Sequence, residues 1–402
     1  MADGTPAQAN PDVGTPAQPL LPFALPDIGE AEINEVVDTL RSGWLTSGPK
    51  VQKFEAAFRE LTGASHAVAL SSATAGLHLA LLAAGVGPGD EVITTPFTFA
   101  ATVNVILHCG GTPVLADISE DDYNIDPEQV ARRITPRTKA IMPVHYSGQP
   151  CRMDDLLSLA RARGLRVIED AAHAIGAEYH GRPVGVLSDA AIFSFYVIKS
   201  ITTGHGGMLT TDDGQLAERV RLLSLHGLSR GAWNRYSAGG SWAYQVLAPG
   251  FNYVMTDIQA AIGIHQIEKL AAYQQRRTHL AGEYGRLLAG VPEVIRPPVR
   301  DDDIVHPWHL YPVRLDHGRL RITREECIEE LRARGIGTSV HFIPIHLHPY
   351  FREALGVAPG DYPAAERVFE GLISLPLYPR MQDADVERVA GALREIVDSG
   401  RR

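Results

Sequence analysis

Short apolar runs alternate with longer helix-like stretches through the first half of the chain. Residues 66–70 (HAVAL), 91–95 (EVITT), 112–116 (TPVLA), 139–144 (KAIMPV) and 166–170 (RVIED) have the length and apolar character of buried strands. The stretches between them, such as TAGLHLALLAAG, FAATVNVILHCG and MDDLLSLARARG, end at glycines and are typical of helices. Strands separated by such helices predict a mostly parallel central sheet flanked by helices.

The second half of the chain begins with two more predicted strands, DAAIFSFY (189–196) and GGMLTTD (206–212). A helical stretch over 256–290 is long enough to carry the chain out of the first domain, and residues after about 295 alternate strand, helix and strand. We therefore predict an α/β fold with a large domain at 21–290 and a smaller C-terminal α/β domain at 291–402. Whether the first segment packs with the small domain is left open.

The composition indicates a globular protein preceded by a disordered tail. Residues 1–20 are rich in Ala, Pro and Gly and cannot bury enough apolar surface to offset the entropy of ordering. The 402 residues are too many for one ordinary core, and 45% of them are hydrophobic, which is typical of soluble proteins. No apolar run of transmembrane length and no secretory signal is visible, so we expect no membrane partner.

Charge and cysteine usage narrow the function classes further. The formal net charge is −10, and basic runs with interleaved aromatic residues are missing, so nucleic acid is a poor candidate partner. Cys109, Cys151 and Cys327 lie far apart without CxxC spacing. This pattern indicates a reducing cytoplasm, with neither a disulfide framework nor a zinc knuckle.

One of the five lysines, Lys199, follows the almost uniformly apolar run AAIFSFYVI. Burying an ammonium group is costly, so its pKa falls and the lysine becomes an amine nucleophile. A lysine at the end of a buried strand can also pack its stem while its head reaches water. The spacing alone leaves both interpretations open.

Polar or aromatic residues follow several predicted strands, at the edge where ligands bind in sheets of this type. Asp170 ends RVIED, Thr98 and Phe99 follow EVITT, and SSATAG (71–76) lies between a strand and a helix. SSATAG offers backbone N–H groups at a helix N-terminus and therefore a phosphate cradle, although an ordinary N-cap has the same residues. Together with Lys199, these groups are expected to meet in one cleft.

The combination matches what pyridoxal phosphate (PLP) requires. Lys199 supplies an amine for a Schiff base, Asp170 an acid for the pyridinium nitrogen, SSATAG a phosphate site and Phe99 a ring-stacking face. A dinucleotide is a poorer match. The glycine-rich GVGPGD follows a predicted helix, whereas the glycine-rich motif of dinucleotide-binding proteins stands at the start of a helix.

The chain resembles the PLP-dependent nucleotide-sugar aminotransferases of the DegT and StrS type from about residue 22 to its end. The ordered stretches that carry this resemblance are SGWLTSGPKVQKFE, SSATAGLHLAL, GDEVITTPFTFAATVN, PVHYSGQP, VIEDAAHAIGAEY, FSFYVIKSITTGHGG, GFNYVMTDIQAAIG, WHLYPVR, GIGTSVHFIPIH and ISLPLYP. Within the family, SSATAG, VIEDAAHA and HGLSR look closest to UDP-4-amino-4-deoxy-L-arabinose aminotransferases and perosamine-type synthases. The resemblance implies fold type I of the PLP-dependent transferases and a homodimer with shared active sites.

The resemblance also implies roles for residues of the cofactor site. Lys199 would form the Schiff base and move the proton, and Asp170 would pair with the pyridinium. The remaining cofactor contacts would come from Ala73, Thr74 and Ser194 at the phosphate, Asn252 reaching over from the second subunit to the same phosphate, Phe99 stacked on the ring and His173 near the ring hydroxyl.

His341 and His346 would face the sugar nucleotide by the same resemblance. With His348 they could also form a metal site, but the sequence places no carboxylates beside them, and we predict no metal. One position departs from the family, because His205 of TGHGG stands where many members have an acid. This substitution leaves open the local hydrogen bonding and the donor or substrate preference.

The activity implied is transfer of an amino group from L-glutamate to a nucleoside-diphosphate keto sugar, at carbon 4, for glycan or natural-product biosynthesis. Amination at carbon 3 is the first alternative. A dehydratase that uses pyridoxamine phosphate is disfavoured, because such relatives carry histidine at the Schiff-base lysine. A regulatory or binding protein on the same fold is disfavoured by the complete set of site residues.

Overall fold

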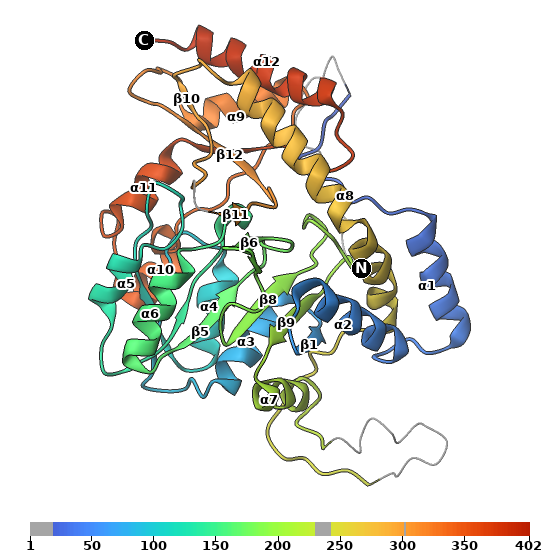
Figure 1. The fold of residues 1–402 in the computed structure, drawn as a ribbon. Helices are drawn as coiled ribbons and strands as arrows, with labels where there is room; N and C mark the ends of the chain where they lie inside the picture. The colour runs from blue at the N-terminus through green and yellow to red at the C-terminus, as the bar shows by residue number, and fades with distance from the viewer. Residues whose placement is uncertain (1–18, 230–242, 301–302) are drawn as a thin grey trace, which may run out of the picture.

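The computed structural model describes residues 19–229, 243–300 and 303–402 (Figure 1). The predicted disordered tail therefore lies outside the described residues, except for Pro19 and Leu20. The strands are β1 (His66–Leu70), β2 (Glu91–Thr94), β3 (Thr112–Leu115), β4 (Thr138–Met142), β5 (Arg166–Asp170), β6 (Glu178–Tyr179), β7 (Arg182–Pro183), β8 (Ala190–Ser194), β9 (Gly207–Thr211), β10 (Val294–Ile295), β11 (Ile304–Val305), β12 (Tyr311–Leu315) and β13 (Leu372–Leu375).

The helices surround these strands. They are α1 (Glu30–Ser42), α2 (Pro49–Thr62), α3 (Ala73–Ala83), α4 (Ala100–His108), α5 (Pro127–Arg133), α6 (Met153–Arg163), α7 (Gly214–Ser224), α8 (Asp257–Leu287), α9 (Arg324–Ala333), α10 (Pro349–Leu355), α11 (Pro363–Glu370) and α12 (Asp383–Ser399). Short 3₁₀ turns occur at Tyr146–Gly148 and Ile345–Leu347.

The central sheet has seven strands in the order β1-β9-β8-β5-β4-β2-β3. Only β9 runs antiparallel to its neighbours, so the carboxyl ends of the other six strands lie at one edge. The predicted mostly parallel α/β sheet is confirmed, and its strands begin and end within two residues of their predicted positions. Two smaller sheets, β10-β12-β13 and β11-β6-β7, complete the fold.

Alternate residues of each central strand face opposite layers of helices. In β1, Ala67 and Ala69 join the core that contains Phe54 of α2, whereas Val68 and Leu70 join the core formed with α3 and α7. Because side chains alternate with a period of two, a strand that is apolar at every position must be covered on both faces. This burial explains the uninterrupted apolar runs in the sequence.

Helix α8 belongs to two hydrophobic cores. It has 31 residues, which corresponds to about 46 Å at the usual helical rise. Ile264 and Leu270 in its first half pack into the core of the central sheet, whereas Leu280 and Tyr284 in its second half pack into the core around β12 and α12. Figure 1 shows α8 running from the central sheet to the C-terminal helix.

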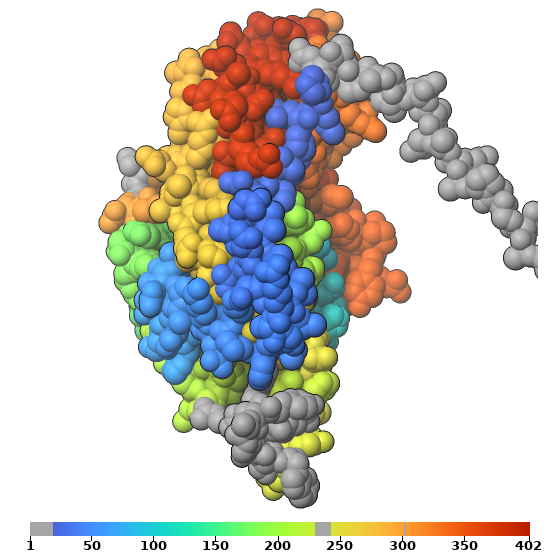
Figure 2. All heavy atoms as spheres, turned by 90° about the vertical axis from the view of Figure 1, so that its right-hand side faces the viewer, coloured from blue at the N-terminus to red at the C-terminus, as the bar shows by residue number. Residues whose placement is uncertain are grey.

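The N-terminal segment also reaches the C-terminal part of the chain. Leu21 lies in the second core and pairs with Ile336, and the Arg388 guanidinium donates to the carbonyl of Pro19 at 3.0 Å. Figure 2 shows this segment, in blue, running beside α8 toward the red C-terminal helix. The first segment thus packs with the predicted small domain, while the boundary at residue 290 stays a prediction.

Within the described residues, no helix combines the length and apolar character needed to cross a bilayer. The three cysteines are buried and unpaired.

Asp257, the first residue of α8, caps α2 from a distance in sequence. Its carboxylate accepts hydrogen bonds from the backbone N–H groups of Lys50 (3.1 Å) and Val51 (3.0 Å), and the N-cap of α2, Gly48, has no side chain to do so. Asp257→Ala would leave two N–H groups without acceptors. We expect it to lower the free energy of unfolding by about 2–3 kcal/mol, measured by urea denaturation.

Asp257→Asn is the matched control, because its amide oxygen keeps one acceptor, and it should lie between Asp257→Ala and the wild-type protein. Equal urea midpoints for all three proteins would contradict this capping role.

Candidate active site

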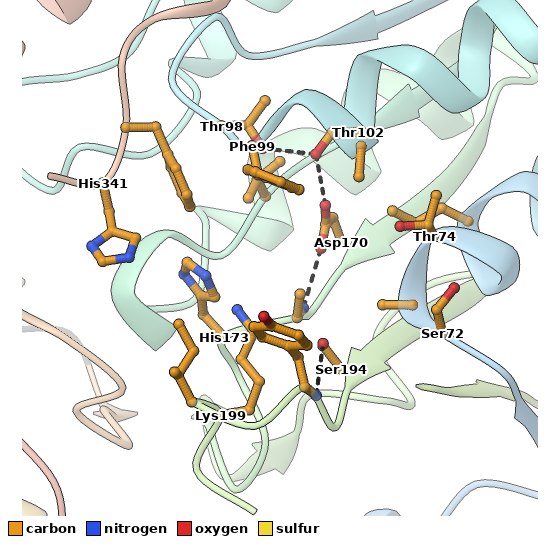
Figure 3. A pocket seen from close by; sticks show the side chains of 18 of the residues that line it. Ser72, Thr74, Thr98, Phe99, Thr102, Asp170, His173, Ser194, Lys199 and His341 are labelled. Carbon is orange, nitrogen blue, oxygen red and sulfur yellow. Dashed lines mark hydrogen bonds between the residues drawn. The ribbon is translucent and has the colours of Figure 1, made fainter. Parts of the chain in front are cut away.

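A pocket of about 550 Å³ opens at the carboxyl ends of the central strands. Eight of the ten residues predicted for the site line it, namely Lys199, Asp170, Ala73, Thr74, Phe99, His173, Ser194 and His341. Figure 3 labels all of them except Ala73 and shows the labelled side chains around a common space. The expected convergence of strand-end residues on one cleft is therefore observed.

Asp170 ends β5 and is only 5% exposed. Its carboxyl accepts a hydrogen bond from the hydroxyl of Thr102 at 2.8 Å and from the backbone N–H of Ala172 at 3.2 Å, and the Thr98 hydroxyl lies 2.7 Å from that of Thr102. Burial raises the pKa of Asp170, while these donors and the charge of Lys199 lower it. The carboxylate is thus held in place and left in need of a cation.

Lys199 follows β8 and lines the pocket. Its amine has no hydrogen bond to any described residue, and burial lowers its pKa to about 8 while the charge of Asp170 raises it. A substantial neutral fraction at physiological pH makes this amine a nucleophile. Of the two interpretations left open by the sequence, the structure supports the buried amine.

The first turn of α3 forms an anion cradle at the pocket. Ser72 is the N-cap and its hydroxyl accepts from the N–H of Ala75 at 3.0 Å, whereas the N–H groups of Ala73 and Thr74 have no acceptor within the helix. Gly207 presses against this turn, because a Cβ there would lie 2.5 Å from the backbone nitrogen of Ala73. The side chain of Ser194, at the end of β8, lines the same pocket.

An aromatic group forms another wall of the pocket. Phe99 is 63% exposed, and its ring centroid lies 6.0 Å from that of Phe342. The Phe342 ring in turn stacks on His173, with centroids 5.7 Å apart. An exposed aromatic face beside an anion cradle suits a flat heterocycle.

His341 comes from the C-terminal part of the chain. Its Nδ1 is hydrogen-bonded to the hydroxyl of Ser374 at 2.9 Å, and its ring stacks on Phe23 of the N-terminal segment. Burial and the charge of Lys199 lower the pKa of His341 to about 4, so the imidazole is neutral at physiological pH. This ring can exchange hydrogen bonds with a ligand without carrying charge.

Two predicted residues lie outside the pocket. Asn252 is exposed on the surface, and its predicted contribution concerns a second subunit. His346 is 0% exposed, its Nε2 is hydrogen-bonded to the Glu366 carboxylate at 2.8 Å, and Tyr362 packs against its ring. His346 is not among the residues that line the pocket, and its predicted contact with the sugar nucleotide stays a prediction.

No group of three or more His, Cys, Asp or Glu side chains in the part of the chain that the structure describes is arranged to hold a metal ion.

The pocket residues that were not anticipated include Thr102, Tyr196 and Phe342. Thr102 could have been found, because it lies one helical turn after Phe99 and so faces the same side of α4. Tyr196 lies in the apolar run before Lys199, and Phe342 directly follows His341. Nothing in the local sequence distinguishes either aromatic residue from a core residue. Their roles depend on the tertiary fold.

His205, the residue that departs from the family pattern, also lines the pocket. Its Nδ1 lies 3.0 Å from the carbonyl oxygen of Ser71, so Nδ1 carries the hydrogen of this bond. The Tyr196 ring meets His205 edge-on at 5.7 Å. This geometry leaves Nε2 of His205 available to a ligand next to the anion cradle.

The residues of the pocket fit PLP. A buried carboxyl group without a cation, an amine without a hydrogen bond and a helix N-terminus that lines the pocket match the pyridinium, the aldehyde and the phosphate of this cofactor. Together with the mostly parallel sheet, they define a PLP-dependent transferase of fold type I.

Residues 26–394 match the DegT/DnrJ/EryC1/StrS aminotransferase family, and the chain belongs to this family. It is 52% identical over 378 residues to the spore coat polysaccharide biosynthesis protein SpsC of Bacillus subtilis, covering 94% of this chain and 97% of that protein. It is therefore a PLP-dependent aminotransferase of the sugar-modifying type.

Solved structures of two sugar aminotransferases are similar along almost the whole chain. The putative sugar aminotransferase Spr1654 of Streptococcus pneumoniae, in its pyridoxamine phosphate form, superposes with a TM-score of 0.89 at 34% identity, over 94% of this chain and 99% of that one. DesI in the presence of its TDP-sugar product gives a TM-score of 0.83 at 37% identity, over 96% of this chain and 95% of that one.

The lowered pKa of Lys199 predicts the pH dependence of cofactor capture. Only the neutral amine attacks an aldehyde, so the rate at which the apoprotein takes up PLP should rise with pH and reach half its maximum near pH about 8. Stopped-flow absorbance would measure it. In Asp170→Asn the midpoint should fall, because the charge that raises the pKa of Lys199 is gone. A midpoint near 10.5, the ordinary lysine value, would contradict the buried-amine interpretation.

Thr102→Val removes the donor to the Asp170 carboxylate while keeping the side-chain volume. The pKa of Asp170 should then rise further, so the carboxylate pairs less well with the pyridinium and PLP affinity falls by about tenfold, the equivalent of one charge-assisted hydrogen bond. Cofactor titration followed by absorbance measures this change. Thr102→Ser keeps the hydroxyl and should bind PLP like the wild type; equal affinity of the valine variant would refute the role.

Proposed function

We propose that the protein transfers an amino group from L-glutamate to carbon 4 of a nucleotide-linked keto sugar. The observation that carries this proposal is the placement of the Lys199 amine and the Asp170 carboxyl in one pocket, beside the anion cradle of α3. The family supports amino transfer to a sugar, and the motif resemblance to carbon-4 aminotransferases supports the position.

Each residue of the proposed site has a task in holding PLP. The N–H groups of Ala73 and Thr74 and the hydroxyl of Ser194 would bind the phosphate, and Phe99 would stack on the ring. Asp170, oriented by Thr102, would pair with the ring nitrogen. When bound, PLP supplies an electron sink for the carbon from which a proton is removed.

The Nζ atom of Lys199 would move the proton of the substrate carbon. With a pKa of about 8, the amine can take a proton from the substrate carbon and return it to the cofactor side within the same pocket. The neutral His341, held through Nδ1 by Ser374, would bind the sugar with Nε2. The rings of Phe342 and Phe99 form an apolar wall on this side of the pocket.

The substrate half of the proposal rests on the size and the position of the pocket. A pocket of about 550 Å³ is large enough for a sugar beside the cofactor, and a relative, DesI, was solved in the presence of its TDP-sugar product. We further propose a homodimer in which Asn252 of the second subunit completes the phosphate site. We also propose that the protein acts in the cytoplasm. The exposed position of Asn252 and the three free cysteines support these two points.

The decisive experiment combines the purified holoprotein with L-glutamate and then with nucleoside-diphosphate 4-keto and 3-keto sugars, followed by absorbance and mass detection. We expect glutamate to convert bound PLP to pyridoxamine phosphate and the 4-keto sugar to leave as its 4-amino product, with parallel double-reciprocal lines. Lys199→Ala should lower turnover by roughly 10²–10⁴-fold.

Lys139→Ala is the matched control, because Lys139 is exposed on β4 and should not affect turnover. Preference for the 3-keto sugar would move the reaction to carbon 3, and a dehydrated sugar would replace amino transfer by elimination. A PLP absorbance band that survives unchanged in Lys199→Ala would overturn the assignment of Lys199.

A further inference from the structure

His205 lies on the segment between Lys199 and β9, and hydrogen bonds hold both its backbone and its ring. Its backbone carbonyl accepts from the Gln259 amide at 2.8 Å and from the Thr203 hydroxyl at 2.9 Å. Its ring is held separately, because Nδ1 lies 3.0 Å from the carbonyl oxygen of Ser71. The ring is exposed and lines the pocket, so its place there does not come from packing in the core.

The segment that carries His205 lies directly against the first turn of α3. Gly207 makes this approach possible, because a Cβ there would lie 2.5 Å from the backbone nitrogen of Ala73. Ser71, whose carbonyl holds the ring, directly precedes the N-cap Ser72. The ring of His205 is therefore anchored within one residue of the helix N-terminus that forms the anion cradle.

The hydrogen bond of Nδ1 determines what Nε2 of His205 can do. A carbonyl oxygen only accepts, so Nδ1 carries a hydrogen, and in the neutral ring Nε2 is then an acceptor. A phosphate dianion also offers only acceptors. Nε2 can therefore bond to a phosphate oxygen only when the ring takes up a second proton, and the bond is then charge-assisted. No described residue is hydrogen-bonded to Nε2, which leaves it free for such a ligand.

The other basic side chains of the pocket cannot supply a positive charge to a bound phosphate. Burial lowers the pKa of His341 to about 4 and holds the pKa of His173 well below its usual range, so both rings are neutral at physiological pH. Lys199 would be occupied by the PLP aldehyde, and no arginine is among the described residues that line the pocket. Because the His205 ring is exposed, burial does not oppose its protonation.

The groups around His205 leave room for a new negative charge to act on its ring. The titratable side chains that line the pocket with it are Asp170, Lys199, His173, His341 and Tyr196. The Ser71 carbonyl and the Gln259 amide, which contact His205 from the start of α3 and from α8, do not titrate. A phosphate at the cradle would add about two negative charges beside this ring and so favour its protonation.

We propose that His205 binds the phosphate of PLP through Nε2 as a doubly protonated ring, so that cofactor binding takes up a proton. The inference rests on the proposed function, since it adds a side-chain cation to the phosphate site assigned there. Ala73 and Thr74 supply backbone N–H groups, and His205 supplies the charge. An acid, which many members of the family have at this position, could not make this contact, so the proton uptake is a property of this chain.

The first test measures the binding of pyridoxine 5′-phosphate to the apoprotein by calorimetry. This alcohol analogue of PLP has the phosphate but no aldehyde, so it binds without reacting with Lys199. The wild-type protein should bind it about tenfold more tightly than His205→Gln, which keeps hydrogen-bonding groups but cannot ionise, at about pH 6.

This advantage should be complete below the usual histidine value of about 6.5 and should be lost by about pH 9, as the pH rises through the higher value of the complex. His205→Lys is the matched control, because its side chain stays cationic over this range and should keep the tighter binding at both pH values.

The second test reads the ring directly, by nitrogen-15 NMR of labelled histidines in the wild-type apoprotein, with the signal assigned by His205→Gln. Without ligand, the neutral ring should carry its hydrogen on Nδ1. Pyridoxine 5′-phosphate should raise the pH midpoint of ring protonation by about one unit, the equivalent of a tenfold gain in affinity. Inorganic phosphate should move the midpoint in the same direction, whereas pyridoxine without phosphate and L-glutamate should not.

A midpoint that does not move with pyridoxine 5′-phosphate overturns the proposal, and so does one that moves with L-glutamate alone, which would place the donor carboxylate at His205. Equal affinities of the wild-type protein and His205→Gln at both pH values also overturn it. If His205→Gln does not fold, His205→Lys assigns the signal and the wild-type titration decides. A wild-type protein with the proton uptake but without amino transfer would refute the proposed function and leave His205 as a phosphate ligand.

Discussion

The burial of the Lys199 amine and the Asp170 carboxyl in the same pocket is the interaction on which the site depends. Burial lowers the pKa of Lys199 and raises the pKa of Asp170, so it favours the neutral form of each group. The attraction between the two charged forms opposes both shifts. Neither group is satisfied by the other, since no ion pair forms between them. The result is an amine that is reactive near neutral pH and a carboxyl that a bound cation can ionise fully.

Much of the fold could be predicted from the sequence, because the central strands are buried on both faces and so appear as uninterrupted apolar runs. The same rule led to Asp170 and Lys199, since parallel strands bring their carboxyl ends to one edge. Thr102 was within reach of the same reasoning, one helical turn beyond Phe99. The order of the strands therefore predicted which of these residues would meet, whereas their chemistry came from the combination of residue types.

The contacts of other residues could not be predicted, because segments distant in sequence determine them. His346 lies in the 3₁₀ turn Ile345–Leu347, and its ring is hydrogen-bonded to Glu366 of α11. The backbone of His309 is hydrogen-bonded to Ser147 and Arg277, which lie far from it in sequence. Spacing carries no information on such contacts.

The shared helix α8 limits how this protein can be recombined. A segment cut at residue 290 would leave Leu280 and Tyr284 behind and lose Leu21, all of which belong to the core around β12 and α12. His341 and Phe342 would then rest on an incomplete core. A chimera meant to exchange the pocket wall formed by His341 and Phe342 must therefore carry the N-terminal segment and the last turns of α8 together with the C-terminal residues. This wall is therefore not a separable module in this fold.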